Sequence, residues 1–500
     1  MQPNSRWIVL AVVSSALLLI VVDMTVLYTA LPTLSHDLQA TATEKLWIVN
    51  AYALTVAGLL PLMGALSDRH GPRLLFLSGL VVFGLASLLA AYSPSASILI
   101  GARVVLAVGA AMMMPATLAI IRVVFEDPSE RSFAIGVWAA VASGGAAFGP
   151  VLGGVLLEFF WWGSVFLINV PIVVLALVVT IAIVPQFKGD PERRVDMIGS
   201  VQVMVGLVAV IFAIKEAAKG VTYLPVAALI AAAGLVFLVL FARRQLRSAH
   251  PMIDFALFRN PVFSAGVIAA LFCAAALLGM EFAVSQELQL ASGLSPLQAG
   301  LTILPIPLSA FFAGPTAGLI MPRVGAMRLL WIGLAGAGLG IASLTFTHDL
   351  GGLAQIASFV VTGASLGATM TAASAAILLN APANAAGAAA SVEEVSYELG
   401  GAIGVAILGG LLSGVYSASF VAPDVGVETS RARDSFDGAI LLAQNLGGAA
   451  SDALLGAART AFSSAFEITI ITAAALLIAA ALAVAISTLK SRNPNGSRTE

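Results

Sequence analysis

The chain has 500 residues, of which 60% are hydrophobic and only 10% are charged, and its formal net charge is −2. A water-soluble protein of this length needs more polar cover, so the composition excludes that class and indicates a polytopic helical membrane protein. The single cysteine, Cys273, excludes an internal disulfide, and the four histidines are too scattered in sequence for a metal site.

Apolar runs of about 18 or more residues recur along the chain and predict fourteen membrane-spanning helices. They are expected at residues 7–30, 46–66, 74–92, 97–121, 133–157, 163–184, 197–214, 222–242, 262–282, 297–321, 328–346, 352–378, 387–413 and 463–489. The first run has no A-x-A cleavage pattern and is interpreted as a retained helix. The segment 414–462 is predicted to be a long external loop in which stretches such as 438–446 and 451–462 could form short helices, and either a flap over an exit or a passive insertion fits its composition.

Asp23 lies inside the first apolar run, in VVDMTVLYTALP. A charged side chain at the bilayer centre costs about 3 kcal/mol or more if it faces lipid, so Asp23 should face the interior or carry a proton. A carboxylate in a medium of low dielectric can exchange a proton in the physiological range, and a cation can then compete with that proton for the site. The alternative is a structural Asp that bonds a neighbouring helix.

Two similar stretches predict an internal repeat, GALSDRHGPRLL at 64–75 and GLIMPRVGAMRLL at 318–330. Both contain Gly, then Arg five residues on, then Gly two further on. Copies on the same side of the membrane indicate two parallel halves around a central path. We therefore predict an N-terminal six-helix bundle (1–190), two additional helices (191–255) and a C-terminal six-helix bundle (256–500). Coincidence between short cytoplasmic turns rich in Gly and Arg is the alternative.

The basic residues indicate the orientation of the chain. Of the 24 Lys and Arg, 17 fall on the side of the N-terminus, six on the other side, and Arg103 lies within a span. The positive-inside rule therefore predicts that both termini are cytoplasmic. As the lone base within a span, Arg103 needs a partner or a wet cavity, and it is a candidate either for proton coupling or for an ordinary ion pair.

An acidic cluster opens the thirteenth predicted helix, in SVEEVSYELGGAIG (391–404). Glu394 and Glu398 are four residues apart and share a helix face, whereas Glu393 points about 100° away. Such a cluster suits cation binding or proton relay, and a solvated helix start is the alternative. Glu281 and Glu467 lie near predicted helix ends, where solvation explains them.

With these motifs in order, the chain resembles the fourteen-helix branch of the drug:proton antiporters in the major facilitator superfamily. The helix-one motif has Asp23, Thr25, Ala30, Leu31 and Pro32, and the loop between helices two and three has Gly64, Asp68, Arg69, Gly71 and Arg73. The helix-four motif has Arg103 and Gly109, and the helix-five motif of antiporters has Gly149, Pro150, Gly153 and Gly154. In helix thirteen, Glu394, Tyr397, Glu398, Leu399 and Gly400 match the family pattern, and Glu393 is additional.

The resemblance implies an all-α major facilitator fold and a function without enzymatic activity, cofactor or metal. It is strongest to bacterial exporters of quaternary ammonium compounds, biguanides, methyl viologen and dyes such as ethidium and acriflavine. We expect proton-driven export of lipophilic cations by a monomer in the bacterial plasma (inner) membrane, with no nucleic-acid partner. The alternative is a major-facilitator exporter of a specific cationic or neutral metabolite. An ATP-driven pump is excluded because no Lys follows a Gly, so the chain has no phosphate-binding loop motif.

Several further residues are candidates for a substrate pocket or a gate. Trp47, Tyr52 and Tyr397 are candidate aromatic walls for a flat cation, although interfacial anchoring is the alternative for such residues. Asn50 stands where the family usually has Asp, so the helix-two carboxylate is missing. Asp68 is a candidate latch of the gate beside Arg69.

Overall fold

The computed structural model describes residues 3–492 except 187–188, 190–195, 219–222, 249–250, 252, 254, 348–351, 382–385 and 425–426. For some further residues, mainly in the fifth and fifteenth helices, only the backbone is described. Within this part of the chain every regular element is a helix. This confirms the predicted all-α class.

The first half of the chain forms long helices joined by short turns. They are α1 (Pro3–Asp37), α2 (Ala42–His70), α3 (Pro72–Ala91), α4 (Ala96–Val124), α5 (Pro128–Phe159), α6 (Ser164–Leu167), α7 (Asn169–Ile183), α8 (Met197–Ala218) and α9 (Leu224–Arg247). The second half has η2 (Phe255–Arg259), α10 (Pro261–Gln286), η3 (Glu287–Ala291), α11 (Pro296–Ile303), α12 (Pro305–Val324), α13 (Ala326–Thr347), α14 (Gly352–Leu378), α15 (Ala386–Ser419), α16 (Ser430–Asp434), α17 (Phe436–Leu446) and α18 (Gly448–Arg492).

Thirteen stretches of the described residues are long and apolar enough to cross a membrane. The remaining predicted span, 133–157, lies within the 32-residue helix α5. Two predicted spans are each broken into two helices, α6 with α7 and α11 with α12. Pro171 and Pro305 explain the breaks, because proline has no N–H to donate to the preceding turn.

The two similar Gly–Arg–Gly stretches form turns of the same geometry. Gly71 ends α2 with φ 91° and ψ 140°, and Gly325 ends α12 with φ 88° and ψ 141°. Each N–H donates to the carbonyl four residues before it, Gly71 to Ser67 at 2.9 Å and Gly325 to Met321 at 2.8 Å. Since a positive φ strains any residue with a Cβ, glycine is required at both positions, as the predicted repeat implies.

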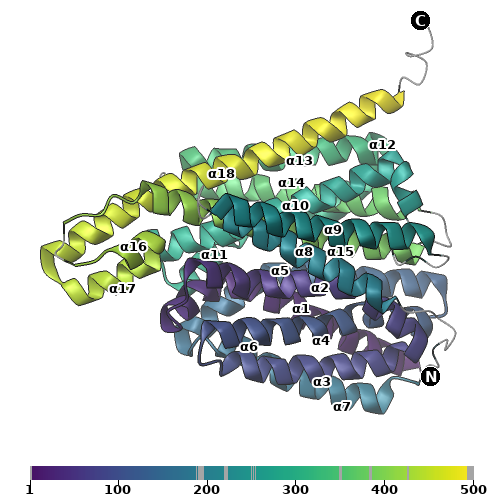
Figure 1. Cartoon of the computed structure of the whole chain (residues 1–500). Helices are drawn as coiled ribbons and strands as arrows, with labels where there is room; N and C mark the ends of the chain where they lie inside the picture. Colours follow the sequence, from purple (N-terminus) through teal and green to yellow (C-terminus); the bar gives the residue numbers. More distant parts are fainter. Residues whose placement is uncertain are drawn as a thin grey trace, which may run out of the picture.

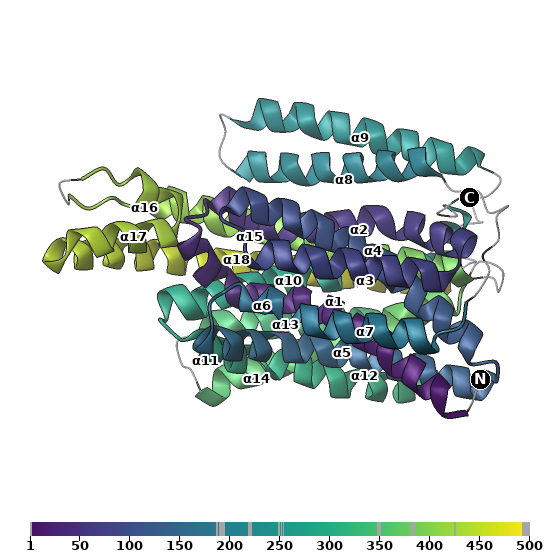
Figure 2. The same ribbon diagram turned by 90° about the horizontal axis from the view of Figure 1, so that it is seen from below.

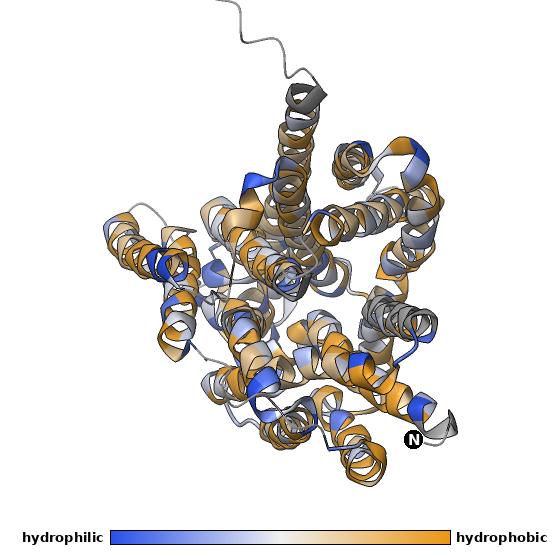
Figure 3. Cartoon of the chain, turned by 90° about the vertical axis from the view of Figure 1, so that its right-hand side faces the viewer, coloured by the Kyte–Doolittle hydropathy of each residue, from blue (hydrophilic) through white to orange (hydrophobic). Residues whose placement is uncertain are grey.

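Helices early in the chain pack mainly on one another, and so do helices from α10 onward. The start of α1 and the end of α18 lie at the same end of the bundle, on the right in Figure 1. Viewed from that end, the outer helices are mostly hydrophobic along their length (Figure 3). The predicted division at 190 and 255, and the cytoplasmic location of the termini, stay predictions.

The pair α8–α9 lies outside the remaining helices (Figure 2) and contacts them through α2 and α15. Asp196, the residue before α8, links the start of α8 to the last turn of α9. Its carboxylate accepts from the N–H of Gly199 at 2.9 Å and from the Arg244 guanidinium at 2.8 Å. Partial burial raises the pKa of Asp196, but these bonds and one from Gln245 outweigh that effect and lower the pKa below its usual value. Asp196 is therefore kept in its charged form, and in that form it links α8 to α9.

The structure bears out the helical stretches predicted within the loop at 414–462 and shows that helix extends much further than predicted. The described residues there are largely helical, and α18 runs as one 45-residue helix through the predicted loop into the last span. With α16 and α17 it forms a hairpin that projects beyond the bundle at the end opposite the termini (Figure 1). The rings of Tyr416, Phe436 and Phe462 pack edge to face beneath it, with centroids 5.4–6.4 Å apart. Packing of this apolar cluster makes the segment an ordered cap.

A buried ion pair joins this cap to the first half of the chain. Lys45, near the start of α2, pairs with Asp437 of α17, and their side chains are only 6% and 5% exposed. Tyr416 also donates from its hydroxyl to the carbonyl of Ala432 at 2.7 Å. The cap therefore bridges helices that lie far apart in sequence.

We expect Asp437→Asn to lower the stability of the purified protein, because it removes the ion-pair partner of the buried Lys45 and leaves only the attraction of Asp434. Replacing both residues by apolar ones of similar volume, as in Lys45→Met/Asp437→Leu, should restore most of that loss. Thermal unfolding in detergent measures both effects, with the exposed Asp452→Asn of α18 as the control. Equal unfolding temperatures for Asp437→Asn and the control would contradict a stabilising pair.

Candidate functional site

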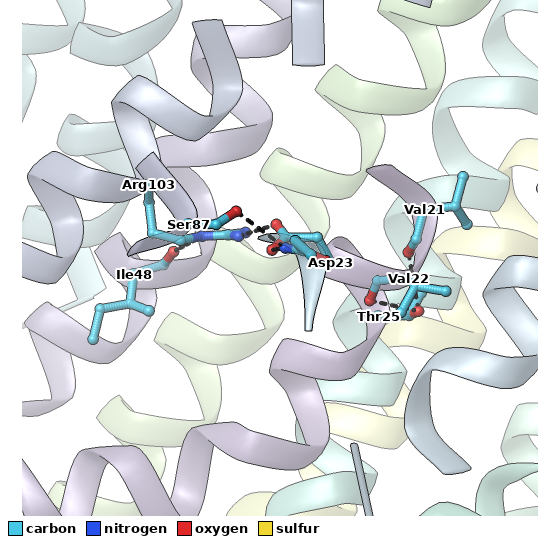
Figure 4. A network of polar contacts seen from close by, with 8 residues as sticks. Val21, Val22, Asp23, Thr25, Ile48, Ser87 and Arg103 are labelled. Carbon is cyan, nitrogen blue, oxygen red and sulfur yellow. Dashed lines mark hydrogen bonds and ion pairs between the residues drawn. The ribbon is translucent and has the colours of Figure 1, made fainter. Parts of the chain in front are cut away.

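Asp23 is fully buried and forms an ion pair with Arg103 of α4 (Figure 4). The guanidinium donates from Nη1 to Asp23 Oδ2 and from Nε to the carbonyl of Ile48 at 3.2 Å. Arg103 is 1% exposed, so both charges are removed from lipid and water alike. Of the two alternatives for Arg103, the structure contains the ion pair.

Two polar residues that the sequence analysis missed complete this network. Asn169 of α7 donates to Asp23 Oδ1 and to Ser87 Oγ of α3, each at 3.3 Å. Residues of five helices of the first half, α1, α2, α3, α4 and α7, thus form one polar network around this carboxylate. A signal existed in the sequence, since Asn169 is an isolated amide within a predicted apolar span.

A narrow cavity opens beside this pair, between the two halves. It is lined by Met24, Tyr28, Val49, Asn50, Tyr52, Ala53, Arg103, Leu278, Gly401 and Ala402. Its space of about 10 Å³ holds roughly one water molecule. An organic cation can therefore enter only after the helices move apart.

Asn50 and Tyr52 of α2 both line this cavity, as expected for residues of the predicted substrate pocket. The Arg103 guanidinium carbon lies 4.3 Å from the centroid of the Tyr52 ring, a cation–π contact. Neither amide atom of Asn50 has a hydrogen-bond partner within the described part of the chain. Unsatisfied buried polar atoms are costly, so this amide is available for a ligand or water.

The acidic residues of α15 approach the cavity to different degrees. Glu398 is 6% exposed, its Oε2 has no partner among the described residues, and it lies one turn before the lining residues Gly401 and Ala402. It also lies within electrostatic reach of Tyr52. Glu394 is half-buried one turn further away, and Glu393 faces Ser374 of α14. Glu398 is thus the acid that the fold brings to the Asp23–Arg103 pair.

Three other predicted pocket residues do not line the cavity. The Thr25 hydroxyl donates to the carbonyl of Val21 at 3.0 Å, so its bond is spent within α1 (Figure 4). Trp47 packs on Phe212 of α8 with ring centroids 5.9 Å apart. Tyr397 donates to the carbonyl of Met370 in α14 at 3.3 Å. In this conformation these side chains support helix packing.

The glycines of the predicted helix-five motif allow α5 to approach two neighbours closely. A Cβ on Gly149 would lie 2.9 Å from Thr25 Cβ of α1, and one on Gly154 would lie 2.5 Å from Leu297 Cα of α11. Gly153 packs against Val26, and the carbonyl of Pro150 packs against Gly300. Small residues permit such contact between helices. The motif therefore forms an interface between the first half and α11 of the second half.

The other two glycine-containing motifs also lie at helix contacts. A Cβ on Gly109 of α4 would lie 2.7 Å from the Phe83 nitrogen of α3. Arg73 donates to the carbonyl of Ile181 at 2.9 Å, which satisfies a free group in the last turn of α7. Asp68 and Arg69 are exposed where α2 ends, near Gly64 and Gly71, and the gating role of Asp68 stays a prediction.

The charges around the cavity determine which ligands it can accept. Asp23 neutralises Arg103, and Glu398 adds a negative charge without a basic partner in the described residues. An unpaired carboxylate in the membrane interior is costly as an anion, and a bound proton or cation relieves that cost. The arrangement suits an exchange of protons for cations and disfavours anionic ligands.

Comparison with known proteins identifies the family of the chain and two relatives that match it over nearly its full length. Residues 13–405 match the family described as the Major Facilitator Superfamily. The chain is 40% identical over 496 residues to the methyl viologen resistance protein SmvA of Salmonella typhimurium, covering 97% of this chain and 99% of that protein. It is also 40% identical over 490 residues to the multidrug efflux pump LfrA of Mycolicibacterium smegmatis, covering 97% of each.

The fold also resembles that of a bacterial homologue of the human lysosomal transporter Spinster in an inward-facing and occupied conformation. The TM-score is 0.69, the sequence identity is 14%, and both chains are covered completely. At this identity the likeness concerns the fold alone.

Proposed function

The chain belongs to the Major Facilitator Superfamily, and on that premise we propose that it is a proton-coupled antiporter that exports lipophilic organic cations. Its family and its full-length relatives make it a multi-pass membrane transporter for drug efflux. Its proposed substrates are quaternary ammonium compounds, biguanides, methyl viologen and dyes such as ethidium. Its proposed location is the bacterial inner membrane, and its proposed driving force is the proton gradient.

One observation carries the proposal. Glu398, a buried carboxylate without a partner among the described residues, lies one turn of α15 before the lining residues Gly401 and Ala402 of a cavity whose base, Arg103, is already neutralised by Asp23. A lipophilic cation supplies the missing positive charge, and Tyr52 supplies an aromatic face beside it. A proton arriving from the other side of the membrane can take the same position.

The cycle that we propose has two exchanges at this site. When the cavity opens inward, a cation displaces a proton from the carboxylates. When it opens outward, a proton displaces the cation, which leaves. The interfaces of α5 with α11 and of α2 with α15 would separate in turn, because they join the two halves.

Transport by inverted membrane vesicles tests this proposal. An imposed proton gradient, acidic inside, should drive uptake of ethidium by vesicles that contain the protein and not by empty vesicles. A panel of neutral amino acids and sugars runs in parallel. Movement of one of these metabolites without movement of ethidium, tetraphenylphosphonium or methyl viologen would favour the carrier for a defined metabolite and contradict our proposal.

Asn50→Asp should extend recognition toward dications. The new carboxylate would face the cavity beside Arg103 and add a second negative charge where Asn50 now has no partner. We expect the methyl viologen concentration that gives half-maximal transport to fall about tenfold if the added attraction is near 1.4 kcal/mol. The control is Asn50→Leu, which changes polarity without adding charge. An unchanged ratio of methyl viologen to ethidium transport would remove Asn50 from the site.

A further inference from the structure

Glu281 of α10 is a buried carboxylate that the mechanism above does not use. It is 4% exposed, its Oε2 has no hydrogen-bond partner, and it has no ion-pair partner among the described residues. The predicted location of Glu281 at a solvated helix end is wrong, because the side chain is buried. The helix continues to Gln286 and then through η3 to Ala291, so further turns cover Glu281.

The helical spacing places Glu281 on the face of α10 that is directed at the first half of the chain. Leu278, three residues before it, lines the central cavity. Ser285, four residues after it, donates to the carbonyl of Tyr28 in α1 at 2.8 Å. Residues three and four apart share a face, so Glu281 faces α1 between these two contacts. Tyr28, another lining residue, lies within electrostatic reach of Glu281.

Glu281 and Glu398 lie on opposite sides of the cavity along the membrane normal. The helices α10 and α15 run parallel, since Gly400 packs on Leu271, Gly404 on Ala275 and Gly279 on Leu408. In this register Glu398 lies level with the first third of α10, and Glu281 lies beyond Leu408. The lining residues Leu278 and Gly401 fall between the two carboxylates.

A second cavity lies beyond Glu281, under the projecting cap. Its lining includes Phe282 and Gln286 of α10, Lys45 of α2, Tyr416 of α15, and Asp434 and Phe436 of the cap. Phe282 is the residue directly after Glu281 in α10, and Gln286 lies five residues after Glu281 in the same helix. Glu281 is therefore situated between the central cavity and the cavity under the cap.

From these positions we propose that Glu281 is a second cation site, on the path between the central cavity and the cavity under the cap. Its ligand is a single positive charge, supplied by a lipophilic organic cation or by a proton. Tyr28 of α1, the titratable group within electrostatic reach of Glu281, provides no positive charge. This inference rests on the proposed function, and it adds a carboxylate to the part of the route nearest the cap.

The test uses the full-length protein purified in detergent and tetraphenylphosphonium as the probe. Calorimetry measures its affinity at pH 8, and a pH-sensitive dye in weakly buffered solution measures the protons released per cation bound. The variants are Glu281→Gln and Glu281→Asp. The control is Glu467→Gln, which makes the same chemical change at an exposed position of α18. Thermal unfolding checks that each variant is folded.

Glu281→Gln should weaken tetraphenylphosphonium binding about tenfold if the organic cation occupies the site, since one buried charge contact is lost. It should instead release fewer protons at unchanged affinity if the proton occupies the site. Glu281→Asp should retain both properties. Wild-type affinity and wild-type proton release in Glu281→Gln, as in the control, would overturn the inference.

Failure of this inference differs from failure of the proposed function. Wild-type protein that neither binds tetraphenylphosphonium nor releases protons would overturn both. Normal binding and release by the wild type together with an unaffected Glu281→Gln overturns the Glu281 site alone. Should Glu281→Gln not fold, Glu281→Met removes the carboxylate and its need for a polar partner, and the same comparison applies.

Discussion

Asp23→Asn is expected to reduce proton-driven ethidium export to the level of empty vesicles and also to destabilise the protein. The substitution leaves the Arg103 guanidinium buried opposite a neutral amide. Removing one partner of a buried ion pair costs about 3–5 kcal/mol, because the remaining charge is uncompensated. Arginine cannot release this charge, since it stays protonated at any ordinary pH.

The reverse substitution should be less damaging to stability. In Arg103→Leu the Asp23 carboxyl can become neutral by binding a proton, and Asn169 still donates to it. We therefore expect the unfolding temperature in detergent to fall in the order wild type, Arg103→Leu, Asp23→Asn. The double variant Asp23→Asn/Arg103→Leu should recover most of the stability and none of the transport.

The surface pair Arg6–Glu130 provides the control, because its side chains are 31% and 33% exposed. Pairs that water still reaches contribute much less than fully buried ones, so Glu130→Gln should lose far less stability than Asp23→Asn and should transport much as the wild type does. Ethidium export by Asp23→Asn at the wild-type rate would contradict a coupling role for Asp23. Export regained by the double variant would show that the pair serves folding alone.

Glu398→Gln should abolish proton-driven ethidium export with little or no loss of stability. Glu398 is buried with an unsatisfied oxygen and has no basic partner among the described residues, so its removal relieves a desolvation cost. The combination of lost transport and retained unfolding temperature distinguishes it from Asp23→Asn. Vesicle uptake and thermal unfolding of the same preparation provide the two measurements.

Two other acids provide the comparisons for this result. Glu394→Gln should reduce transport less than Glu398→Gln, because Glu394 is half-buried and lies one turn further from the cavity. Glu467→Gln, at an exposed position of α18, should leave transport unchanged. Equal transport by Glu398→Gln and Glu467→Gln would exclude Glu398 from the exchange. A larger loss in Glu394→Gln would place the site nearer the start of α15.

Much of the fold could be predicted because membrane helices follow from local composition. The absence of water in lipid forces each apolar run to satisfy its own backbone hydrogen bonds, so hydropathy alone identifies the spans. The extent of helix in the segment after Ser419 was underestimated for a related reason. Its composition resembles a loop with short helices, and the packing of Phe436 and Phe462 on Tyr416 belongs to the tertiary structure.

The order of residues by itself indicates that Asp23, Arg103 and Glu398 are too costly to face lipid, and that Gly71 and Gly325 repeat one turn. It does not indicate which groups meet. The Asp23–Arg103 pair joins positions 80 residues apart, and Asn169 reaches Asp23 across 146 residues. Glu281 resembled a helix end because the span was predicted to stop at 282, four residues before α10 ends. Burial and pairing depend on how helices distant in sequence pack, and that information exists only in three dimensions.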